Sequence, residues 1–433
     1  MANTGKGLRR AVFVDGARIP FLKSGTGYKD LTSYDLARLA LTALLNKTQL
    51  PGNEVDWVIL GNVVANINTS NVAREAALAA GIPHRVPAVS LALACISANK
   101  AITNGVDLIR SGEADVVIAG GTESLTDIPI RFRKRFRQKL IESQRYRKPL
   151  DYLGFFKGLK ASDFLPEIPA IAEFSTGRTM GQDCDRMAAR LGVTREEQDV
   201  FAARSHQLAA RATAEGFLAQ EIWPTAVPPR FDLISADNGF RADSTAESLA
   251  NLRPAFIKPY GTLTAGNSSF LTDGAGAVLL MSEEKAAALG YAPKAAIRSY
   301  AYTAQDPEEE LLLGPAYSTP KVLAKAGLSL ADIGVFEMHE AFAAQVVANL
   351  KCLDSDTFGR EKLGLPGKVG EIPPDRLNAW GGSLSLGHPF GATGARLVTT
   401  TVNRMIHEDR EFGLTTSCAA GAHGSAIILE RLA

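Results

Sequence analysis

Two stretches of the chain follow the same order of elements, and this duplication constrains the fold more than any other feature of the sequence. In the first, an apolar run from Val89 ends at Cys95, a helical pattern follows, and an apolar strand then ends at Gly120-Gly121. In the second, a glycine-rich segment from Leu377 leads to His388, and a helical pattern and an apolar strand follow again. A turn of small residues and one more apolar strand complete each stretch. Such an ordered repeat predicts two similar halves packed together, with His388 in the position of Cys95.

Predicted strands and helices alternate along the chain, which favours an α/β fold with helices layered around a mixed sheet. The runs 57–60 and 115–119 are apolar without interruption, as expected of strands covered on both faces. In the second half the last two strands follow directly, whereas a long block separates them in the first half. We therefore predict an N-terminal half (residues 1–125 plus 265–287), an inserted loop domain (residues 126–264) and a C-terminal half (residues 288–433). Within the insert, Thr194 to Glu197 match a capping box and predict a helix through Ala212.

Composition excludes several classes of protein. The chain has 433 residues and a net charge of +1, which argues against bulk attraction to nucleic acid or membrane. Its four cysteines lie far apart, so we expect no disulfide framework, no metal site and a reducing compartment. No apolar run approaches the roughly 18 residues of a membrane-spanning helix. The residues before the first predicted strand, 11–14, leave no room for a secretory signal, so we expect a cytoplasmic protein or a mature form freed of a mitochondrial leader.

Four reactive side chains share one position, the end of a predicted strand beside a turn of small residues: Cys95, His339, His388 and Cys418. α/β folds place their sites at such strand ends. Cys95 also precedes a predicted helix, whose N-terminal N–H groups and dipole favour a thiolate, so we expect its pKa to fall below the usual value of roughly 8.5. Taken alone, one cysteine is more often an inert core thiol. The shared position of all four side chains predicts a functional site.

The motifs around these residues resemble the thiolase family. They comprise, in order, residues 89–101, 338–342, 381–394 and 418–424, and their order and spacing agree over essentially the whole chain. Within the family, His-Glu-Ala-Phe at 339–342, in place of the more common Asn-Glu-Ala-Phe, is similar to the β-subunit of the trifunctional complex of fatty-acid β-oxidation. The resemblance implies a thiolase-like fold, in which two duplicated α/β halves form a layered αβαβα arrangement with an inserted loop domain.

The same resemblance implies a 3-ketoacyl-CoA thiolase, which is an acetyl-CoA C-acyltransferase. Cys95 would attack the 3-keto carbon and carry the acyl group. Cys418 would protonate the acetyl-CoA enolate and then take the proton of incoming CoA. His388 would activate Cys95 and, with a water held by His339, stabilise the enolate oxygen. The backbone N–H groups of Cys95 and Ala420 would stabilise the tetrahedral intermediate. Coenzyme A would be a co-substrate, and no cofactor is expected.

Five further residues match family positions that line the channel for the CoA pantetheine: Met180, Ala265, Gly266, Ser269 and Phe342. One turn departs from the family pattern. A glycine-rich turn usually follows the second cysteine, whereas Ala422-His423 interrupt it here. If residue 422 needs a positive φ, alanine is strained at that position. The imidazole of His423 would also change the polarity beside Cys418.

Residues 131–160 carry eleven basic and two acidic side chains, with apolar residues such as Leu153 and Phe156 interleaved. This composition fits a solvated face, a nucleic-acid patch, or a segment that docks on a membrane surface or a protein partner. No nucleic-acid motif accompanies the charge. The resemblance implies docking, because the trifunctional β-subunit uses this insertion to meet its hydratase/dehydrogenase partner and the membrane. We therefore expect a homodimer that takes part in an α2β2 complex and contacts the membrane peripherally through residues 131–160.

Two other functions stay open at this point. A decarboxylating 3-ketoacyl synthase also uses one cysteine and two histidines, but it has no role for Cys418. A scaffold or lipid-carrier subunit of a β-oxidation complex would keep the fold without turnover. The altered turn at residues 422–423 is the one feature of the sequence that favours the scaffold.

Overall fold

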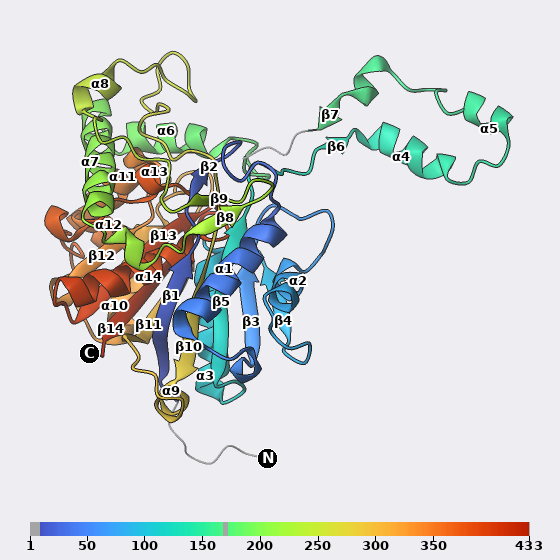
Figure 1. Cartoon of the computed structure of the whole chain (residues 1–433). Helices are drawn as coiled ribbons and strands as arrows, with labels where there is room; N and C mark the ends of the chain where they lie inside the picture. The colour runs from blue at the N-terminus through green and yellow to red at the C-terminus, as the bar shows by residue number, and fades with distance from the viewer. Residues whose placement is uncertain (1–8, 168–171, 433) are drawn as a thin grey trace. The chain divides into compact units, whose positions relative to one another are not determined.

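The computed structural model describes residues 9–167 and 172–432 (Figure 1). Two compact units are present, one formed by the chain up to Asp127 together with the chain from Ala172, the other by Ile128–Ile171. The large unit contains the sheet and the site. Within the described residues, no helix is both long and apolar enough to cross a membrane.

One mixed sheet runs through the large unit in the order β12-β13-β14-β11-β1-β10-β5-β3-β4, and the short strand β2 pairs with β10. The strands of the N-terminal half are β1 (Ala11–Arg18), β2 (Leu22–Lys23), β3 (Trp57–Gly61), β4 (Ala88–Leu91), β5 (Val116–Glu123) and β10 (Thr272–Ser282). Those of the C-terminal half are β11 (Ala295–Ala304), β12 (Val335–Met338), β13 (Phe412–Ala419) and β14 (His423–Arg431).

The pairing of these strands confirms the predicted duplication. In the N-terminal half, β3 pairs parallel with β5, β5 antiparallel with β10, and β10 antiparallel with β1. In the C-terminal half, β12 pairs parallel with β13, β13 antiparallel with β14, and β14 antiparallel with β11. The two series meet where β1 pairs with β11. Each half therefore repeats the same four-strand order, and β4 extends the first half by one parallel strand.

The helices form layers around this sheet. Those of the large unit are α1 (Ser33–Thr48), α2 (Val72–Ala79), α3 (Ser97–Ser111), α6 (Met180–Arg190), α7 (Arg195–Ala214), α8 (Ala246–Ala250), α9 (Glu283–Ala288), α10 (Gly314–Ala326), α11 (Ala343–Leu353), α12 (Asp356–Glu361), α13 (Ser383–Leu386) and α14 (Thr393–His407). A central core joins α3 and α14 to strands of both halves. Separate outer cores join α1 and α2 to the N-terminal strands, and α10 and α11 to the C-terminal strands. These three cores join five layers in the order α-β-α-β-α.

Much of the predicted insert packs with the large unit. The predicted capping box is present at α7, where Thr194 and Glu197 exchange hydrogen bonds of 3.2 and 2.7 Å. A buried arginine of β1, Arg18, binds Glu221 and Asp237 at 2.7–2.8 Å and so ties two loops of this region to the sheet. A short hairpin of β8 (Thr225–Val227) and β9 (Asp232–Ile234) lies in the same region. The predicted three-part division of the chain stays a prediction.

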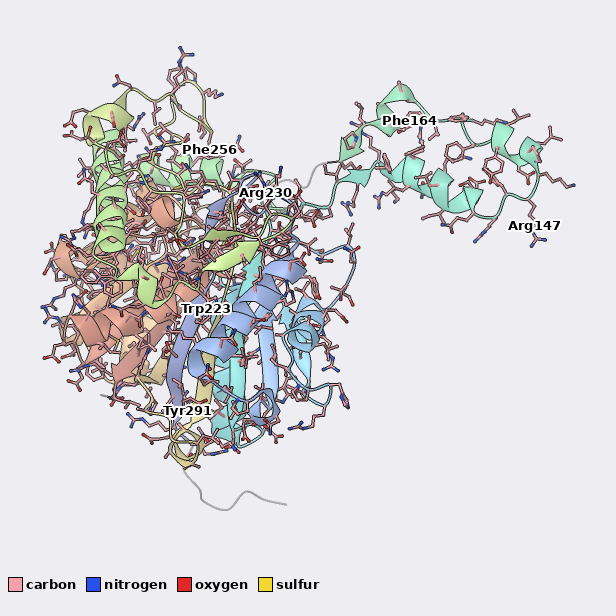
Figure 2. All side chains as sticks on the ribbon, viewed as in Figure 1. Arg147, Phe164, Trp223, Arg230, Phe256 and Tyr291 are labelled. Atoms are coloured by element: carbon pink, nitrogen blue, oxygen red, sulfur yellow. The ribbon has the colours of Figure 1, made fainter. Side chains whose placement is uncertain are left out.

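The small unit is built from short elements that cluster aromatic rings. Its elements are β6 (Arg131–Phe132), α4 (Lys134–Ser143), α5 (Pro149–Leu153) and β7 (Pro166–Glu167), and β6 pairs antiparallel with β7. The ring of Phe136 lies 5.0, 5.9 and 4.8 Å from those of Phe132, Phe155 and Phe164. Figure 2 shows Phe164 in this segment and the exposed Arg147 projecting from it. Several apolar side chains stay exposed, Leu153 by 77% and Phe156 by 65%.

One predicted strand end is wrong. Gly120-Gly121 do not end the strand, because β5 continues to Glu123. These glycines instead allow a close approach of backbone. A Cβ at Gly121 would lie 1.8 Å from the carbonyl oxygen of Gly391, three residues after His388. The strand therefore passes directly beneath the turn that carries His388.

This close approach makes Gly121 a test of the packing. Gly121→Ala should lower the free energy of unfolding by about 2–3 kcal/mol, because either β5 or the 388–391 turn must move to admit the methyl group. Denaturant unfolding followed by circular dichroism measures the loss. The matched control is Gly276→Ala, since Gly276 pairs with Gly121 across the sheet and its Cβ would meet no atom nearer than 3.2 Å. Equal losses in the two variants would contradict the proposed contact.

Candidate active site

Cys95 lies in a tight connection between β4 and α3, as the sequence predicts. The strand ends at Leu91 and the helix begins at Ser97. Ala94 adopts a left-handed conformation with φ 45°, an unfavourable geometry for a residue with a side chain. The Ser97 hydroxyl stabilises the connection, because it accepts from the Leu93 N–H at 2.8 Å and donates to the Ala94 carbonyl at 2.7 Å. A strained and pinned backbone thus fixes the position of Cys95.

The thiol of Cys95 is less acidic than its place before a helix suggests. Burial raises its pKa to about 11, although hydrogen bonds from the backbone N–H groups of Ala420 and of Cys95 itself oppose the rise. The expectation of a lowered pKa is therefore wrong. The residue as a whole is partly exposed, but its sulfur lies among protein atoms that withdraw the thiolate from water. Desolvation outweighs the N-terminal N–H groups here.

A second thiol lies beside the first. Cys418 is a buried residue of β13, and burial together with the nearby Cys95 raises the pKa of its thiol. The Ala420 N–H, two residues after Cys418, donates to the sulfur of Cys95. A third thiol, Cys184 of α6, is close enough to Cys418 for the pKa of Cys184 to be raised by it, after the larger effect of burial. The sequence gives no sign of this third neighbour.

The turn after Cys418 has a positive φ at residue 422, which is the geometry that is unfavourable for alanine. Gly421 has φ 77° and Ala422 has φ 55°, both left-handed. An alanine in this conformation costs roughly 1–2 kcal/mol. Two hydrogen bonds hold the turn: Glu173 accepts from the Gly421 N–H at 2.6 Å, and the Gln305 N–H donates to the Ala422 carbonyl at 3.0 Å. The chain thus adopts the turn despite the missing glycine.

His388 is held from both sides. Its backbone N–H donates to the Thr272 hydroxyl at 3.0 Å, and its Nδ1 lies 2.6 Å from the Thr393 hydroxyl. The turn that follows is anchored by Glu123, which accepts from the Gly391 N–H at 2.9 Å. Burial, with a smaller effect from Arg396, lowers the pKa of His388 to about 3. The imidazole is therefore neutral at physiological pH.

His339 lies against His388, with 4.0 Å between the ring centroids. It follows β12, and its backbone N–H donates to the Thr416 carbonyl at 2.8 Å. Burial lowers the pKa of His339 well below its usual value, and His388 and Arg396 add to the effect. The Nε2 atoms of both histidines are buried and have no hydrogen-bond partner within the described residues. Such orphaned atoms are suited to bind a ligand.

The residues predicted to line a CoA channel lie on connected segments. Residues 267–269 pair with 341–343, through hydrogen bonds of 3.0 Å from the Ser269 N–H to the Ala341 carbonyl and from the Ala343 N–H to the Asn267 carbonyl. Phe342 meets Phe256 edge to face at 5.7 Å. These contacts bring Ser269 and Phe342 together; Met180 packs against the core that contains Phe342. Contact with CoA stays a prediction for Met180, Ala265, Gly266, Ser269 and Phe342.

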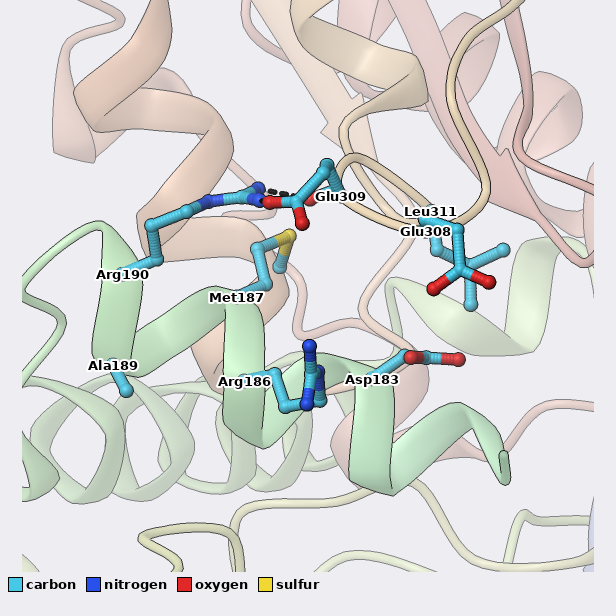
Figure 3. Close-up of a pocket in the computed structure, with 8 residues that line it drawn as sticks. All are labelled: Asp183, Arg186, Met187, Ala189, Arg190, Glu308, Glu309 and Leu311. Atoms are coloured by element: carbon cyan, nitrogen blue, oxygen red, sulfur yellow. Dashed lines mark hydrogen bonds and ion pairs between the residues drawn. The ribbon is translucent and has the colours of Figure 1, made fainter. Parts of the chain in front are cut away.

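A pocket of about 290 Å³ lies between α6 and the 308–311 segment (Figure 3). Arg190 pairs with Glu309 at its edge. None of the predicted site residues lines it. Among the described residues, no cluster of three histidine, cysteine or acidic side chains is arranged to hold a metal ion.

Comparison with known proteins identifies the family. Two family models match the chain: "Thiolase, N-terminal domain" over residues 11–284 and "Thiolase, C-terminal domain" over residues 291–431. The chain belongs to the thiolase family. It is 52% identical to the Bos taurus protein named "Trifunctional enzyme subunit beta, mitochondrial" over 98% of this chain and 88% of that protein. A Caenorhabditis elegans protein named "Probable 3-ketoacyl-CoA thiolase" is 48% identical over 98% of this chain and 95% of its own length.

A solved structure supports the thiolase fold. The Bacillus anthracis acetyl-CoA acetyltransferase superposes with a TM-score of 0.85 at 32% identity, and the match covers 99% of this chain and 100% of the other. The fold predicted from the resemblance, with two duplicated α/β halves in layers, is thereby confirmed.

The side chains that position the residues of this thiolase site are not predicted from the sequence. Ser383 and Thr393 contact the two imidazoles, and Arg396 contacts Ser383 at 3.0 Å. Arg396 lies on α14, where every residue from Thr393 to Met405 is buried. A charged residue at a core position of a predicted helix is the signal that could have revealed it, because a buried arginine needs a buried partner. The partner is Glu337, at 3.0 Å.

The raised pKa of the Cys95 thiol gives a pH prediction for this thiolase without substrate. Because the thiolate is a minor form below about pH 11, its fraction should rise about tenfold for each pH unit between pH 7 and 9. Iodoacetamide alkylation of Cys95, measured by mass spectrometry of the peptide, should follow that slope. Cys95→Ala is the control for peptide assignment. A rate that levels off below pH 8 would mean that a thiolate is already formed.

Proposed function

We propose that this thiolase is a 3-ketoacyl-CoA thiolase that cleaves 3-ketoacyl-CoA with CoA to acyl-CoA and acetyl-CoA. The proposal is supported by two pairs of reactive groups. The thiol of Cys95 lies near enough to raise the pKa of the Cys418 thiol, and the neutral imidazoles of His339 and His388 lie with 4.0 Å between their ring centroids. The His339 N–H donates to the carbonyl of Thr416, two residues before Cys418, and so links the two pairs. The names of the relatives from Bos taurus and Caenorhabditis elegans agree with it. The pathway it fits is fatty-acid β-oxidation.

The first half of the reaction would form an acyl-enzyme. The Nε2 of His388 takes the proton from the Cys95 thiol as the sulfur attacks the 3-keto carbon. Both groups start neutral, since the thiol has a raised pKa and the imidazole a lowered one. The N–H groups of Cys95 and Ala420, which already donate to the sulfur, can serve the oxyanion of the tetrahedral intermediate. Collapse breaks the Cα–Cβ bond, and the acyl group stays on Cys95.

Cys418 would complete both halves. The bond cleavage leaves the acetyl-CoA enolate, whose carbon takes the proton of the Cys418 thiol, and acetyl-CoA departs. The Cys418 thiolate then removes the proton of an incoming CoA thiol, whose sulfur attacks the acyl-thioester of Cys95. Acyl-CoA is released, and the Cys95 thiolate recovers its proton from His388. His339 and His388 together serve the enolate oxygen.

The position of Cys418 near Cys95 also favours a thiolase over a decarboxylating synthase. That chemistry has no use for a second thiol beside the nucleophile. A scaffold without turnover gains little support either, because the 420–422 turn keeps the Ala420 N–H on the sulfur of Cys95 despite Ala422. No cofactor enters the proposed reaction. A cytoplasmic location stays a prediction.

Two cysteine variants test the two roles. With acetoacetyl-CoA and CoA, Cys95→Ala should lose turnover by at least about a thousandfold, because no acyl-enzyme forms. Cys418→Ala should still acquire an acetyl group on Cys95, which intact-protein mass spectrometry detects. Its turnover should be roughly a hundredfold to ten-thousandfold slower, because the general acid and base is missing. Cys352→Ala, which changes a buried thiol outside the site, is the control. Full turnover of Cys95→Ala, or normal turnover of Cys418→Ala, would refute the proposal.

We also propose that the small unit docks on a hydratase/dehydrogenase subunit of a β-oxidation complex. The Bos taurus relative is by name a subunit of a trifunctional enzyme. The small unit combines basic residues with exposed apolar ones, among them Leu150, Leu153 and Phe156. Apolar side chains of this exposure need a cover, and the basic residues suit an acidic partner surface or anionic lipid. The large unit is expected to form the homodimer.

Leu153→Ser with Phe156→Ser should remove this docking and spare the chemistry. Short-chain thiolysis should stay within twofold of wild type, while co-purification with the hydratase/dehydrogenase subunit is lost. Sedimentation with vesicles containing anionic lipid reports peripheral membrane contact in the same variant. Ile67→Ser, which removes an equally exposed apolar residue of the large unit, is the control. Unchanged co-purification and sedimentation would assign residues 131–160 to a solvated face.

A further inference from the structure

The two imidazoles of the site are held by different neighbours, and the difference decides where each carries its proton. His339 Nδ1 lies 2.9 Å from the Ser383 hydroxyl. That hydroxyl also receives a hydrogen bond of 3.0 Å from the Arg396 guanidinium. A guanidinium only donates, so Ser383 must accept from it and has one hydrogen left to donate. Among the described residues, His339 Nδ1 is the one acceptor within reach of that hydrogen.

A buried chain of charges keeps Arg396 in this role. Its other terminal nitrogen binds Glu337 at 3.0 Å, and Glu337 also binds Arg404 at 2.8 Å. The three side chains are fully buried. Glu337 lies on β12 and His339 directly follows that strand, so the same strand positions the carboxylate and the imidazole. The guanidinium is therefore fixed, and the Ser383 oxygen always has a donor on one side.

His388 has the opposite arrangement. Its Nδ1 contacts the Thr393 hydroxyl at 2.6 Å, and that hydroxyl lies 3.0 Å from the carbonyl oxygen of Pro389. A carbonyl only accepts, so both bonds form together only if Thr393 donates to Pro389 and accepts from a hydrogen on His388 Nδ1. The Nε2 of His388 is then an unprotonated acceptor.

We propose that Arg396 and Ser383 are positioning residues that hold His339 as its Nε2–H tautomer, a fixed hydrogen-bond donor, beside a His388 that Thr393 holds as an Nε2 acceptor. The inference rests on the proposed function and deepens it. His388 can take a proton from Cys95, whereas His339 cannot act as a second base because its Nε2 already carries hydrogen. His339 can only donate, to a water or to the developing enolate oxygen. One donor and one acceptor thus face the same space.

The positive charge of Arg396 supports this division of roles. It lies near both rings and helps lower the pKa of each, so neither imidazole is doubly protonated at physiological pH. A neutral ring has one hydrogen and two possible places for it. The neighbours of Nδ1 therefore determine the hydrogen-bonding character of Nε2.

The tautomers can be read directly. The ring nitrogens are labelled with ¹⁵N in all six histidines of the full chain, and long-range correlations to the carbon-bound ring protons distinguish a protonated from an unprotonated nitrogen. The His339 signals are assigned by their absence in His339→Asn. We expect Nε2–H for His339 and Nδ1–H for His388 in the wild type. An Nδ1–H signal for His339 would overturn the proposal without reference to activity.

Variants at Ser383 test the device itself. Ser383→Ala should convert the His339 signals to those of a mixture of tautomers and reduce kcat with acetoacetyl-CoA and CoA by about ten- to a hundredfold, with KM changed less than threefold. Ser383→Thr keeps the hydroxyl and should restore both the signals and most of kcat. The matched control is Ser385→Ala, which removes a buried hydroxyl of the same helix that bonds to Ser205 and Gly382. It should leave the His339 signals unchanged.

The outcomes separate this inference from the proposed function. Wild-type protein that shows the expected tautomers but does not cleave acetoacetyl-CoA would refute the function and leave the positioning device standing. Normal turnover with unchanged His339 signals in Ser383→Ala would refute the device and leave the function standing. If Ser383→Ala does not fold, the wild-type spectrum and Ser383→Thr still decide the question.

Discussion

The contact between α3 and α14, between the two halves of the sheet, is the constraint on which the site depends. At this contact Gly394 faces Asn99 so closely that a Cβ on the glycine would lie 2.2 Å from the Asn99 side chain. Cys95 precedes α3 and His388 precedes α14, so the distance between the thiol and the imidazole is set by how closely these helices approach. The large apolar core around both helices makes any separation of the two starts costly.

Burial has a second consequence at the same place. It raises the pKa of Cys95 and lowers that of His388, so the free site contains a thiol and a neutral imidazole rather than an ion pair. In the proposed reaction, charge develops only as the substrate is attacked, and the N–H groups of Cys95 and Ala420 are already in position to stabilise it. A buried ionic group, Glu337 with Arg396 and Arg404, is joined to the site through the hydrogen bond from Arg396 to Ser383. Removing Glu337 would leave the buried Arg396 guanidinium without its carboxylate, which is strongly destabilising.

The sequence predicts the parts of this arrangement that depend on local order. The duplication and the strand–helix position of Cys95 can be read from periodicity, and the resemblance to the thiolase family draws attention to residue 422, which is left-handed. The predicted direction of the Cys95 pKa shift is wrong because the fold buries the sulfur, and this desolvation outweighs the N–H groups of Ala420 and of Cys95 itself. The predicted end of β5 is also wrong because of a contact with residues distant in the chain. The glycines that suggest a turn are instead required by the close approach of the Gly391 backbone. Ser383 and Arg396 are missed because their function is visible only once β12 and α14 lie side by side.

The duplicated halves also reach across to one another in a reciprocal way. Strand β5 of the first half and β13 of the second hold the same place in the repeated order. The end of β5 supplies Glu123, which accepts from the Gly391 N–H and so anchors the turn of His388 in the other half. The turn after β13 supplies the Ala420 N–H, which donates to Cys95 in the first half. Each strand end therefore stabilises the helix start of the opposite half. A site assembled in this way is complete only when both halves are folded and packed, and neither half alone can position Cys95 relative to His388.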